Sequence, residues 1–317
     1  MDKQQGRVLA IDLGGSKLEV GLVTHQGEIL CTSRQALSGT PYTREALLEK
    51  ISAGVSDLVR QYGELGAAAI GVSIPGPCDP CKGIFLRNFT NDISDWPIVD
   101  DLTRLLGVPV YGDNDVNACA VAEKAFGSCK NYADYMWVTL SFGCGGAFFL
   151  NNALYRGSGF LAGEVGHIPV LFEHRPARCK CGVYGDMEIE GSGTAIGRKY
   201  LEQAGLPPNP TFSSREVSRL ARAGDEKALA LFSESGYYLG RICAMAINML
   251  NLPKIVLGGG VVIYDYDLLK PGIDRALDEL VFPLAKGTCS VEVTALGYHA
   301  SLLGAAALAL GHIAYSQ

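Results

Sequence analysis

Residues 163–193 read GEVGHIPVLFEHRPARCKCGVYGDMEIEGSG, and this stretch decides how the rest of the chain is interpreted. Its closely spaced glycines free the backbone to bend, and only one residue separates Cys179 from Cys181. A tight Cys-x-Cys turn can direct two thiolates at one soft cation, with His167 as a third ligand. The alternative is a polar surface loop with idle cysteines. The Gly-Glu-x-Gly-His before the turn and the Gly-x-x-Gly-x-x-Glu after it favour the metal site.

The overall composition narrows the class of protein. The chain has 317 residues, 48% of them hydrophobic, which is enough for two domains with large cores. A net charge of −6 argues against a nucleic-acid partner. The ten cysteines show no disulfide spacing, the N-terminus shows no signal peptide, and the most apolar segment, Leu302–Leu310, is too short to span a membrane. We therefore expect a cytoplasmic protein.

The first recognisable element is a strand, a glycine turn and a second strand. Val8–Ile11 is apolar and runs into Asp12-Leu13-Gly14-Gly15, and Leu18, Val20 and Leu22 then alternate with other residues as in a strand. Such a turn lets phosphate oxygens approach backbone N–H groups, and Asp12 can orient a magnesium ion. A Rossmann fingerprint would need a helix after the turn and is absent. An ordinary hairpin is the alternative.

A polar cluster, Asp113-Asn114-Asp115-Val116-Asn117, stands between a predicted strand at Val108–Tyr111 and a predicted helix at Val116–Phe126. The carboxyl end of a strand and the start of a helix are where α/β proteins bind ligands. The alternative is that Asp113 or Asn114 only caps the helix. Two Asp and two Asn within five residues exceed what one cap needs.

Two later segments repeat the theme of a strand followed by glycines. Met136–Leu150, MWVTLSFGCGGAFFL, resembles the opening hairpin, and Val138-Thr139-Leu140 aligns with Leu9-Ala10-Ile11. Pro253–Val261 ends in Gly258-Gly259-Gly260, whose bare backbone lets a flat base or ribose pack closely. Plain glycine turns are the alternative for both. The repeat predicts an α/β fold of two actin-like (ribonuclease-H-like) ATPase domains around a central cleft.

Hydrophobic periodicity predicts the remaining elements. Strands are expected at His25–Leu30 and Ala67–Ser73, and helices at Arg44–Tyr62, Gly191–Ala204, Ser214–Ala223, Lys227–Met249, Asp267–Leu280 and His299–Ala314. Asn152–Gly166 is expected to be a connecting loop that delivers Glu164 and His167.

The segment that begins at Gly163 resembles the signature of the ROK family of sugar kinases and sugar-responsive repressors. The family pattern is Gly-Glu-x-Gly-His, about ten residues, then Cys-x-Cys-Gly-x-x-Gly-Cys-x-Glu. Asp186 stands where the family has its third zinc cysteine. A carboxylate oxygen can bind zinc, and His174 is an alternative ligand. The resemblance thus implies a structural zinc ion held by His167, Cys179, Cys181 and Asp186.

The resemblance covers Val8–Ala314 and implies an ATP-dependent hexose kinase that uses Mg²⁺. By this match Asp115 would be the general base that takes the proton of the sugar's primary hydroxyl. The residues expected to bind the sugar are Gly76, Asn114, Asp115, Glu164, His167 and Glu188. The residues expected to bind the nucleotide and its magnesium are Asp12, Gly14, Gly15, Ser16, Lys17, Ser141, Gly143, Gly145, Gly258, Gly259 and Gly260.

Two motifs depart from the family pattern. Val116 replaces the alanine of Asn-Asp-Ala-Asn. The family's Gly-Thr-Gly turn, whose threonine holds the terminal phosphate, is Ser141-Phe142-Gly143 here, and Ser141 can substitute from a neighbouring position. The contacts that choose the sugar are expected in Pro75–Trp96. The sequence of this segment does not distinguish between glucose, a related hexose and an amino sugar such as N-acetylmannosamine as the substrate.

The expected organisation is a smaller α/β domain at 1–117, completed by a C-terminal helix at 300–317, and a larger α/β domain at 118–299 that carries the zinc loop. The resemblance also implies a homodimer. Family repressors have a helix-turn-helix ahead of the first strand, and only six residues precede Arg7, so a repressor is disfavoured. A non-catalytic sugar sensor is the stronger alternative, because positions 141–143 and 186 are altered.

Overall fold

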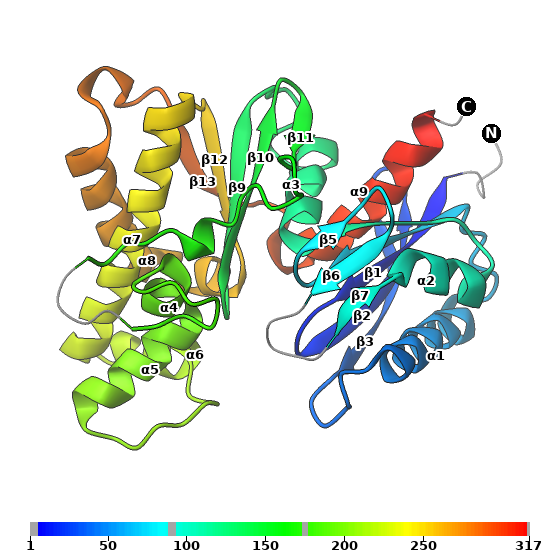
Figure 1. The fold of residues 1–317 in the computed structure, drawn as a ribbon, viewed down its shortest axis with the longest axis horizontal. Helices are drawn as coiled ribbons and strands as arrows, with labels where there is room; N and C mark the ends of the chain where they lie inside the picture. Colours follow the sequence, from blue (N-terminus) through cyan, green and yellow to red (C-terminus); the bar gives the residue numbers. More distant parts are fainter. Residues whose placement is uncertain (1–5, 88–92, 173–176, 316–317) are drawn as a thin grey trace. The chain divides into compact units, whose positions relative to one another are not determined.

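The computed structural model describes residues 6–87, 93–172 and 177–315. Of these, residues 312–315 are described by their backbone alone. The chain divides into two compact units. Unit 1 comprises Met1–Asn131, Arg156–Leu161 and His299–Gln317, and unit 2 comprises Tyr132–Tyr155 and Ala162–Tyr298. Each unit is built around one five-stranded sheet (Figure 1).

The sheet of unit 1 has the strand order β3-β2-β1-β4-β8. Its strands are β1 (Arg7–Leu13), β2 (Lys17–Thr24), β3 (Ile29–Ala36), β4 (Ala69–Ile74) and β8 (Val110–Asn114). Strands β1, β2 and β3 form an antiparallel meander, whereas β1, β4 and β8 run parallel. The central strands β1 and β4 are buried along nearly their whole length, which explains their almost unbroken runs of apolar and small residues.

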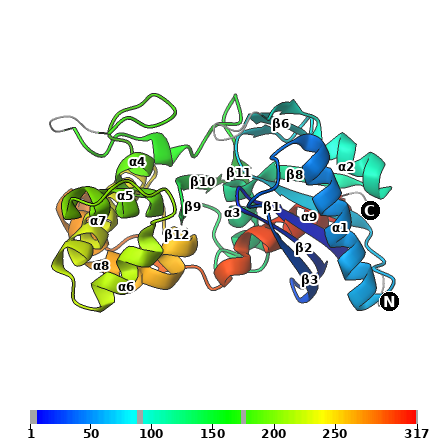
Figure 2. The same ribbon diagram turned by 90° about the horizontal axis from the view of Figure 1, so that it is seen from below.

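The α-helices of unit 1, among the residues that the structure describes, are α1 (Arg44–Tyr62), α2 (Ile98–Leu106), α3 (Asp115–Ala125) and α9 (Ala300–Tyr315). Helix α9 returns from the end of the chain and packs on β1 and β4 (Figure 2). The backbones approach closely, since a Cβ atom on Gly71 would lie 1.6 Å from the carbonyl oxygen of Ala305. Only glycine allows this contact. The domain boundary expected after residue 117 falls inside α3, and all of α3 lies in unit 1.

Unit 1 also contains a small antiparallel sheet within the segment expected to choose the sugar. It consists of β5 (Cys78–Asp79), β6 (Ile84–Arg87) and β7 (Ser94–Trp96). The buried Trp96 donates a hydrogen bond of 2.7 Å from Nε1 to Asp101 of α2, which fixes one end of the sheet. Periodicity did not predict strands of two to four residues, because they are shorter than the pattern it detects. Residues 88–92 of this segment lie outside the described residues.

The sheet of unit 2 has the order β11-β10-β9-β12-β13. Its strands are β9 (Tyr135–Leu140), β10 (Cys144–Leu150), β11 (Ala153–Tyr155), β12 (Lys254–Gly258) and β13 (Ser290–Val293). An antiparallel meander, β9 to β11, is again followed by two parallel neighbours. This is the arrangement of unit 1, so the predicted pair of related halves is confirmed.

In the described part of unit 2 the α-helices are α4 (Met187–Gly191), α5 (Gly193–Ala204), α6 (Ser214–Arg222), α7 (Glu226–Leu250) and α8 (Gly260–Leu280). Helix α7 is central to this unit, with Leu231, Phe232 and Leu239 in the core. It packs closely on α8, since a Cβ atom on Gly236 would lie 2.0 Å from the carbonyl oxygen of Leu269. Within the described ranges, no helix is both long and apolar enough to cross a membrane.

Three predicted elements need correction. The strand predicted at His25–Leu30, with a turn at Gln26-Gly27, begins later: the turn is present and is closed by a Gly27 N to Thr24 O hydrogen bond, and β3 begins only at Ile29. Helix α8 begins at Gly260, whereas the predicted helix began at Asp267. The prediction missed the first turns because the non-helical Asp265 interrupts the helix just before the predicted start. The loop predicted at residues 152–166 contains the short strand β11 and the start of a short helical turn at 165–167.

Candidate active site and metal centre

The parallel strands of unit 1 end at one edge of the sheet, and polar residues occupy that edge. Asp12 of β1 is in register with Ser73 of β4, and Ser73 is in register with Asp113 of β8. The predicted magnesium residue and the predicted catalytic segment therefore lie at the ends of β1 and β8, on either side of β4. This is the position where parallel sheets bind ligands.

The buried carboxylate of Asp12 is held by two side chains. Its Oδ1 accepts a hydrogen bond of 2.6 Å from the hydroxyl of Ser301, and its Oδ2 lies 3.3 Å from Lys17 Nζ. Ser301, in the first turn of α9, also shares a hydrogen bond of 2.7 Å with Ser73. Neither serine was predicted, because no local pattern links residues so far apart in the chain.

Asn114 and Asp115 stand at the junction of β8 and α3. Asn114 Oδ1 accepts from the backbone N–H groups of Val116 and Asn117, so the helix-cap alternative is correct for this residue. Its amide does more than cap: Nδ2 donates to the Gly76 carbonyl at 3.1 Å and to Asp115 Oδ1 at 3.0 Å. Asp115 Oδ1 also accepts from Val116 N at 2.9 Å. Gly76, Asn114 and Asp115 are therefore brought together as predicted.

The carboxylates at this edge of the sheet affect the pKa of a buried thiol, Cys119. Burial raises the pKa of Cys119 well above its usual range, and the negative charges of Asp115 and Asp12 raise it further. Both carboxylates are therefore near enough to Cys119 to disfavour its thiolate form.

Asp113 has a different role from its neighbour Asp115. It is 1% exposed, and its Oδ2 accepts from Arg156 Nε at 2.8 Å and Nη2 at 2.6 Å. Its Oδ1 accepts from Asn117 Nδ2 at 2.9 Å. Sequence reasoning missed Arg156, since it lies in the predicted connecting loop and carries no motif. Asp113 is therefore saturated by partners that hold the strand–helix junction.

The first glycine turn is closed by a hydrogen bond of 2.9 Å from Gly14 N to Lys17 O. A Cβ atom on Gly15 would meet nothing within 4 Å, so the turn is open on that side. The hydroxyl of Tyr42 donates to the Gly14 carbonyl at 3.2 Å. Ser16 O accepts from Leu37 N at 2.9 Å, which ties the turn to the chain beyond β3.

In unit 2 the four predicted metal ligands come together. Ligand atoms of His167, Cys179, Cys181 and Asp186 all lie within 4.8 Å of one another. His167 Nδ1 is 3.1 Å from Asp186 Oδ2, and Cys181 Sγ is 3.5 Å from the same oxygen. Burial raises the pKa of Cys179 to about 12, so binding of a cation at this thiol would release its proton. One imidazole, two thiols and one carboxylate suit zinc.

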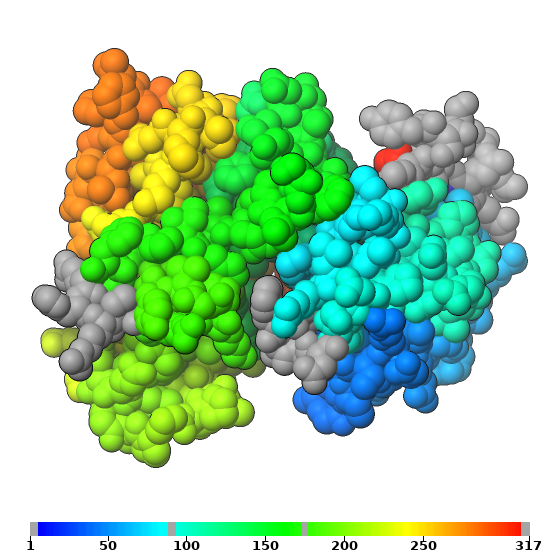
Figure 3. Space-filling model, in the orientation of Figure 1, coloured from blue at the N-terminus to red at the C-terminus, as the bar shows by residue number. Residues whose placement is uncertain are grey.

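The cysteine loop is folded by its own backbone. Cys179 N donates to Val183 O at 2.8 Å, and Gly182 N donates to Cys179 O at 3.0 Å. Gly182 and Gly185 have φ values of 100° and 65°, which only glycine adopts readily. The loop lies at the surface of unit 2 in the green part of Figure 3, with Tyr184 exposed. His174, the alternative ligand, lies outside the described residues.

The two ring nitrogens of His167 face different groups. Nδ1 faces the metal cluster, whereas Nε2 lies 3.9 Å from Glu164 Oε2. Partial desolvation raises the pKa of Glu164, the charge of His167 lowers it, and that of Glu188 raises it. His167 can therefore contact a metal with one nitrogen and a ligand beside Glu164 with the other.

Glu188 links the metal segment to the second glycine turn. Its Oε2 accepts from Cys144 N at 3.2 Å, and a Cβ atom on Gly143 would lie 2.4 Å from that oxygen. Gly145 lies in β10, paired with Thr139 of β9. The predicted sugar residue Glu188 is thus packed directly against the predicted nucleotide residue Gly143.

The second glycine turn also meets the first turns of two helices. Ser141 O accepts from Gly193 N of α5 at 2.8 Å. A Cβ atom on Gly260, the first residue of α8, would lie 3.6 Å from Ser141 Oγ. Helix N-termini present unpaired N–H groups and a partial positive charge, which suits phosphate.

Internal packing accounts for two of the three glycines at 258–260. A Cβ atom on Gly258 would lie 2.3 Å from the Trp137 ring, and one on Gly259 would lie 2.4 Å from Leu140 O. Gly259 also has a φ of 87°. Their identity as glycine therefore does not by itself indicate a nucleotide, and Gly260 is the more open of the three.

The fold and the two groups of polar residues define the class of protein. Two units that repeat one strand order, each with a glycine turn after its first strand, have the actin-like, ribonuclease-H-like ATPase fold. A family model described as ROK family matches residues 8–312, and the chain belongs to the ROK family. The family predicted from the Glu–His–Cys signature is therefore confirmed.

Similar proteins include both enzymes and regulators. The glucokinase of Thermotoga maritima is 29% identical over 95% of this chain and 96% of its own length. The xylose repressor of Bacillus subtilis is 27% identical over 98% of this chain and 79% of its own length. A solved structure of a ROK family glucokinase from Streptomyces griseus, in complex with glucose and AMPPNP, is 29% identical with a TM-score of 0.83, covering 96% of this chain and 99% of that one.

Proposed function

We propose that this protein is an ATP-dependent kinase that phosphorylates a hexose, glucose or a related sugar, at its primary hydroxyl. The observation that carries the proposal is the edge of the unit 1 sheet. There Asp12, beside Lys17 and an open glycine turn, is paired with Ser73 of β4, which in turn is paired with Asp113, two residues before Asp115. A protein that only senses a sugar needs a sugar site but no phosphate-handling turn. Similarity to the glucokinase structure with glucose and AMPPNP supports the same choice.

Asp115 would take the proton of the sugar hydroxyl as that oxygen attacks the γ-phosphorus. Its Oδ1 is already held by Asn114 Nδ2 and by Val116 N, so the carboxylate is oriented before a sugar binds. Asp12 would hold Mg²⁺, which offsets phosphate charge when bound. The turn of Gly14, Gly15, Ser16 and Lys17 would receive the phosphates.

Unit 2 would supply the remaining groups. Glu164, His167 Nε2 and Glu188 would hold the ring hydroxyls of the sugar, and sugars lacking the matching hydroxyls would leave these groups unpaired. Ser141, Gly143, Gly145 and the glycines at 258–260 would contact the nucleotide. Zinc at His167, Cys179, Cys181 and Asp186 would be structural and would fix the loop that carries the sugar contacts.

The test is release of ADP from Mg-ATP in the presence of a panel of hexoses and N-acetylhexosamines. The proposal expects turnover on one sugar, and a 10²- to 10⁴-fold lower kcat in Asp115→Asn with sugar binding retained by calorimetry. Asp274→Asn, in an exposed pair with Lys270, is the matched control and should keep full activity. Turnover on an N-acetylated sugar alone would assign an amino-sugar kinase instead.

A non-catalytic sugar sensor is the second candidate. It is favoured by the altered turn at Ser141-Phe142-Gly143, where Phe142 is 67% exposed, and by Asp186 in place of a zinc cysteine. Sugar binding without ADP release on any sugar of the panel would establish the sensor and refute the kinase.

A further inference from the structure

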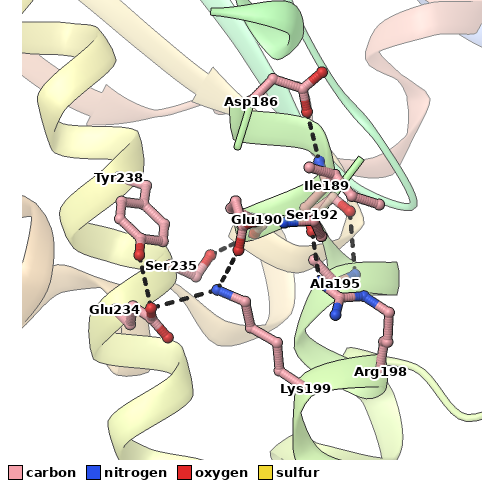
Figure 4. Close-up of polar contacts among 12 residues, drawn as sticks. Asp186, Ile189, Glu190, Ser192, Ala195, Arg198, Lys199, Glu234, Ser235 and Tyr238 are labelled. Carbon is pink, nitrogen blue, oxygen red and sulfur yellow. Dashed lines mark hydrogen bonds and ion pairs between the residues drawn. The ribbon is translucent and has the colours of Figure 1, made fainter. Parts of the chain in front are cut away.

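A chain of polar contacts connects α4, α5 and α7 of unit 2 (Figure 4) and continues to the base of the cysteine loop at Ala177. Its centre is Glu190 of α4, whose Oε2 lies 2.8 Å from Lys199 Nζ of α5. The other oxygen, Oε1, accepts a hydrogen bond of 3.0 Å from the backbone N–H of Ala177, at the base of the loop. Lys199 Nζ also lies 3.3 Å from Glu234 Oε1 of α7, which accepts from the Tyr238 hydroxyl at 2.7 Å.

Burial makes the central ion pair costly. The side chains of Glu190 and Lys199 are only 3% and 13% exposed. Removing two charges from water carries a desolvation cost that two well-packed apolar residues would avoid. Such a pair is weak evidence for stability, but it can specify geometry. Here the second carboxylate oxygen of Glu190 accepts a hydrogen bond from the loop backbone, so the ion pair can hold the loop in a fixed position relative to α4.

The hydrogen bond to Ala177 is made at the base of the loop that carries Cys179 and Cys181, and this loop ends just before Asp186, the N-cap of helix α4. Ala177 O accepts from Gly185 N at 2.9 Å, so this residue closes the base of the loop that carries both cysteines. Asp186, which follows the loop, caps α4 through Ile189 N at 2.8 Å. The cysteine thiols thus belong to the loop, whereas the Asp186 carboxylate is fixed to the helix that also carries Glu190.

We propose that Glu190 is a positioning residue. With Lys199 as its counter-ion, it holds the base of the cysteine loop against α4, and it thereby sets the distance between the thiols of Cys179 and Cys181 and the carboxylate of Asp186. Residues that support metal ligands from behind commonly change metal affinity 10- to 100-fold when they are replaced.

A pair that only packs α4, α5 and α7 together would behave differently, and Arg198 provides the matched control. It lies next to Lys199 on α5 and also binds α4, through a hydrogen bond of 2.9 Å from Nη2 to Ile189 O. Its other described hydrogen bonds go to Glu202 and not to the loop. Loss of Arg198 should loosen the helices without releasing the loop.

The experiment is amide hydrogen exchange of residues 177–186, measured by mass spectrometry on protein stripped of metal with a chelator. In Glu190→Leu and Lys199→Met, the loop amides should exchange about tenfold faster than in the parent, because the hydrogen bond to Ala177 is lost or unsupported. Glu190→Gln keeps an acceptor for Ala177 and should show a smaller rise. Arg198→Gln should leave loop exchange at the parent rate.

Metal binding gives a second readout. Zinc affinity, measured by competition with a coloured chelator, should fall 10- to 100-fold in Glu190→Leu and Lys199→Met, and the visible spectrum of the Co²⁺ form should change. Parent-like loop exchange and an unchanged Co²⁺ spectrum in these variants would overturn the proposal. If Glu190→Leu does not fold, the conservative Glu190→Gln against Arg198→Gln decides. The metal readout rests on the zinc site proposed above, but the exchange readout requires neither bound metal nor kinase activity.

Discussion

Asp186 performs two tasks with its two oxygens, and substitutions can separate them. Oδ1 caps helix α4 by accepting from Ile189 N at 2.8 Å. Oδ2 faces the other proposed metal ligands, 3.1 Å from His167 Nδ1 and 3.5 Å from Cys181 Sγ. Asp186→Asn keeps a capping oxygen but removes the charge, whereas Asp186→Ala removes both. Asp186→Cys introduces the soft ligand of the family signature but removes the cap.

The expected magnitudes follow from these contacts. Asn caps helices as well as Asp, so without metal the free energy of unfolding of Asp186→Asn should stay within about 1 kcal/mol of the parent. The Ala and Cys variants should each lose about 1 kcal/mol more than the Asn variant, because the cap is gone. Loss of an anionic ligand should weaken zinc binding in the Asn and Ala variants at least about 100-fold, or roughly 2.7 kcal/mol. The Cys variant should bind zinc more tightly than the parent.

Urea denaturation in the presence of a chelator measures the first effect, and zinc competition with a coloured chelator measures the second. Parent-like zinc affinity in Asp186→Asn would show that Asp186 is not a ligand, and the metal assignment would then be wrong. Equal stability of the metal-free Asn and Ala variants would show that the cap contributes nothing, which would refute the reasoning about α4.

Three further predictions concern stability. Arg156→Met leaves the carboxylate of Asp113, 1% exposed, without its cation and should lower the free energy of unfolding by about 3 kcal/mol in urea; a loss below about 1 kcal/mol would contradict the role given to this pair. Gly71→Ala, in β4, drives a methyl group into the carbonyl of Ala305 in α9 and should cost more than about 3 kcal/mol. Gly311→Ala, in α9 itself and with open space around it, should instead raise the melting temperature through a gain of up to about 1 kcal/mol. A hydrogen bond from the backbone N–H of Ser213 lowers the pKa of Glu216. The contribution of this carboxylate to the free energy of unfolding is therefore complete above the unfolded pKa of about 4.3 and is lost as the pH falls through the folded value. Glu216→Gln should flatten this part of the stability–pH curve, and an unchanged curve would rule the contribution out.

The cysteine loop is an example of a structure that neighbouring residues in the sequence can predict. A tight turn is a property of a few consecutive residues, and glycine is present at both positions of the loop, 182 and 185, where φ is positive. The spacing of Cys179 and Cys181 predicted that these two side chains and His167 come together, and the resemblance to the family added Asp186; the four residues do lie together. The Glu–His–Cys signature predicted the family. Helices such as α1 and α7 were predicted for the same reason, since one apolar face repeats along many residues.

The glycines at 258–260 show where local reading is ambiguous. The sequence alone indicates a place where something approaches the backbone closely. In the structure the approaching groups are the Trp137 ring and the Leu140 carbonyl, at two of the three positions. A ligand and an internal side chain impose the same requirement on the backbone, so composition does not distinguish them.

Neighbouring and periodic residues were enough to predict the family, the two related halves, most of the longer strands and helices, and the four residues that cluster at the candidate metal site. The partners that hold the functional groups, and short elements such as β5, β6 and β7, became evident only in the folded structure. Ser301 reaches Asp12 across 289 residues, and Arg156 reaches Asp113 across 43. These contacts depend on the register of β1, β4 and β8 and on the packing of α9 against them. Register and packing arise from non-local pairing, which hydrophobic periodicity does not contain.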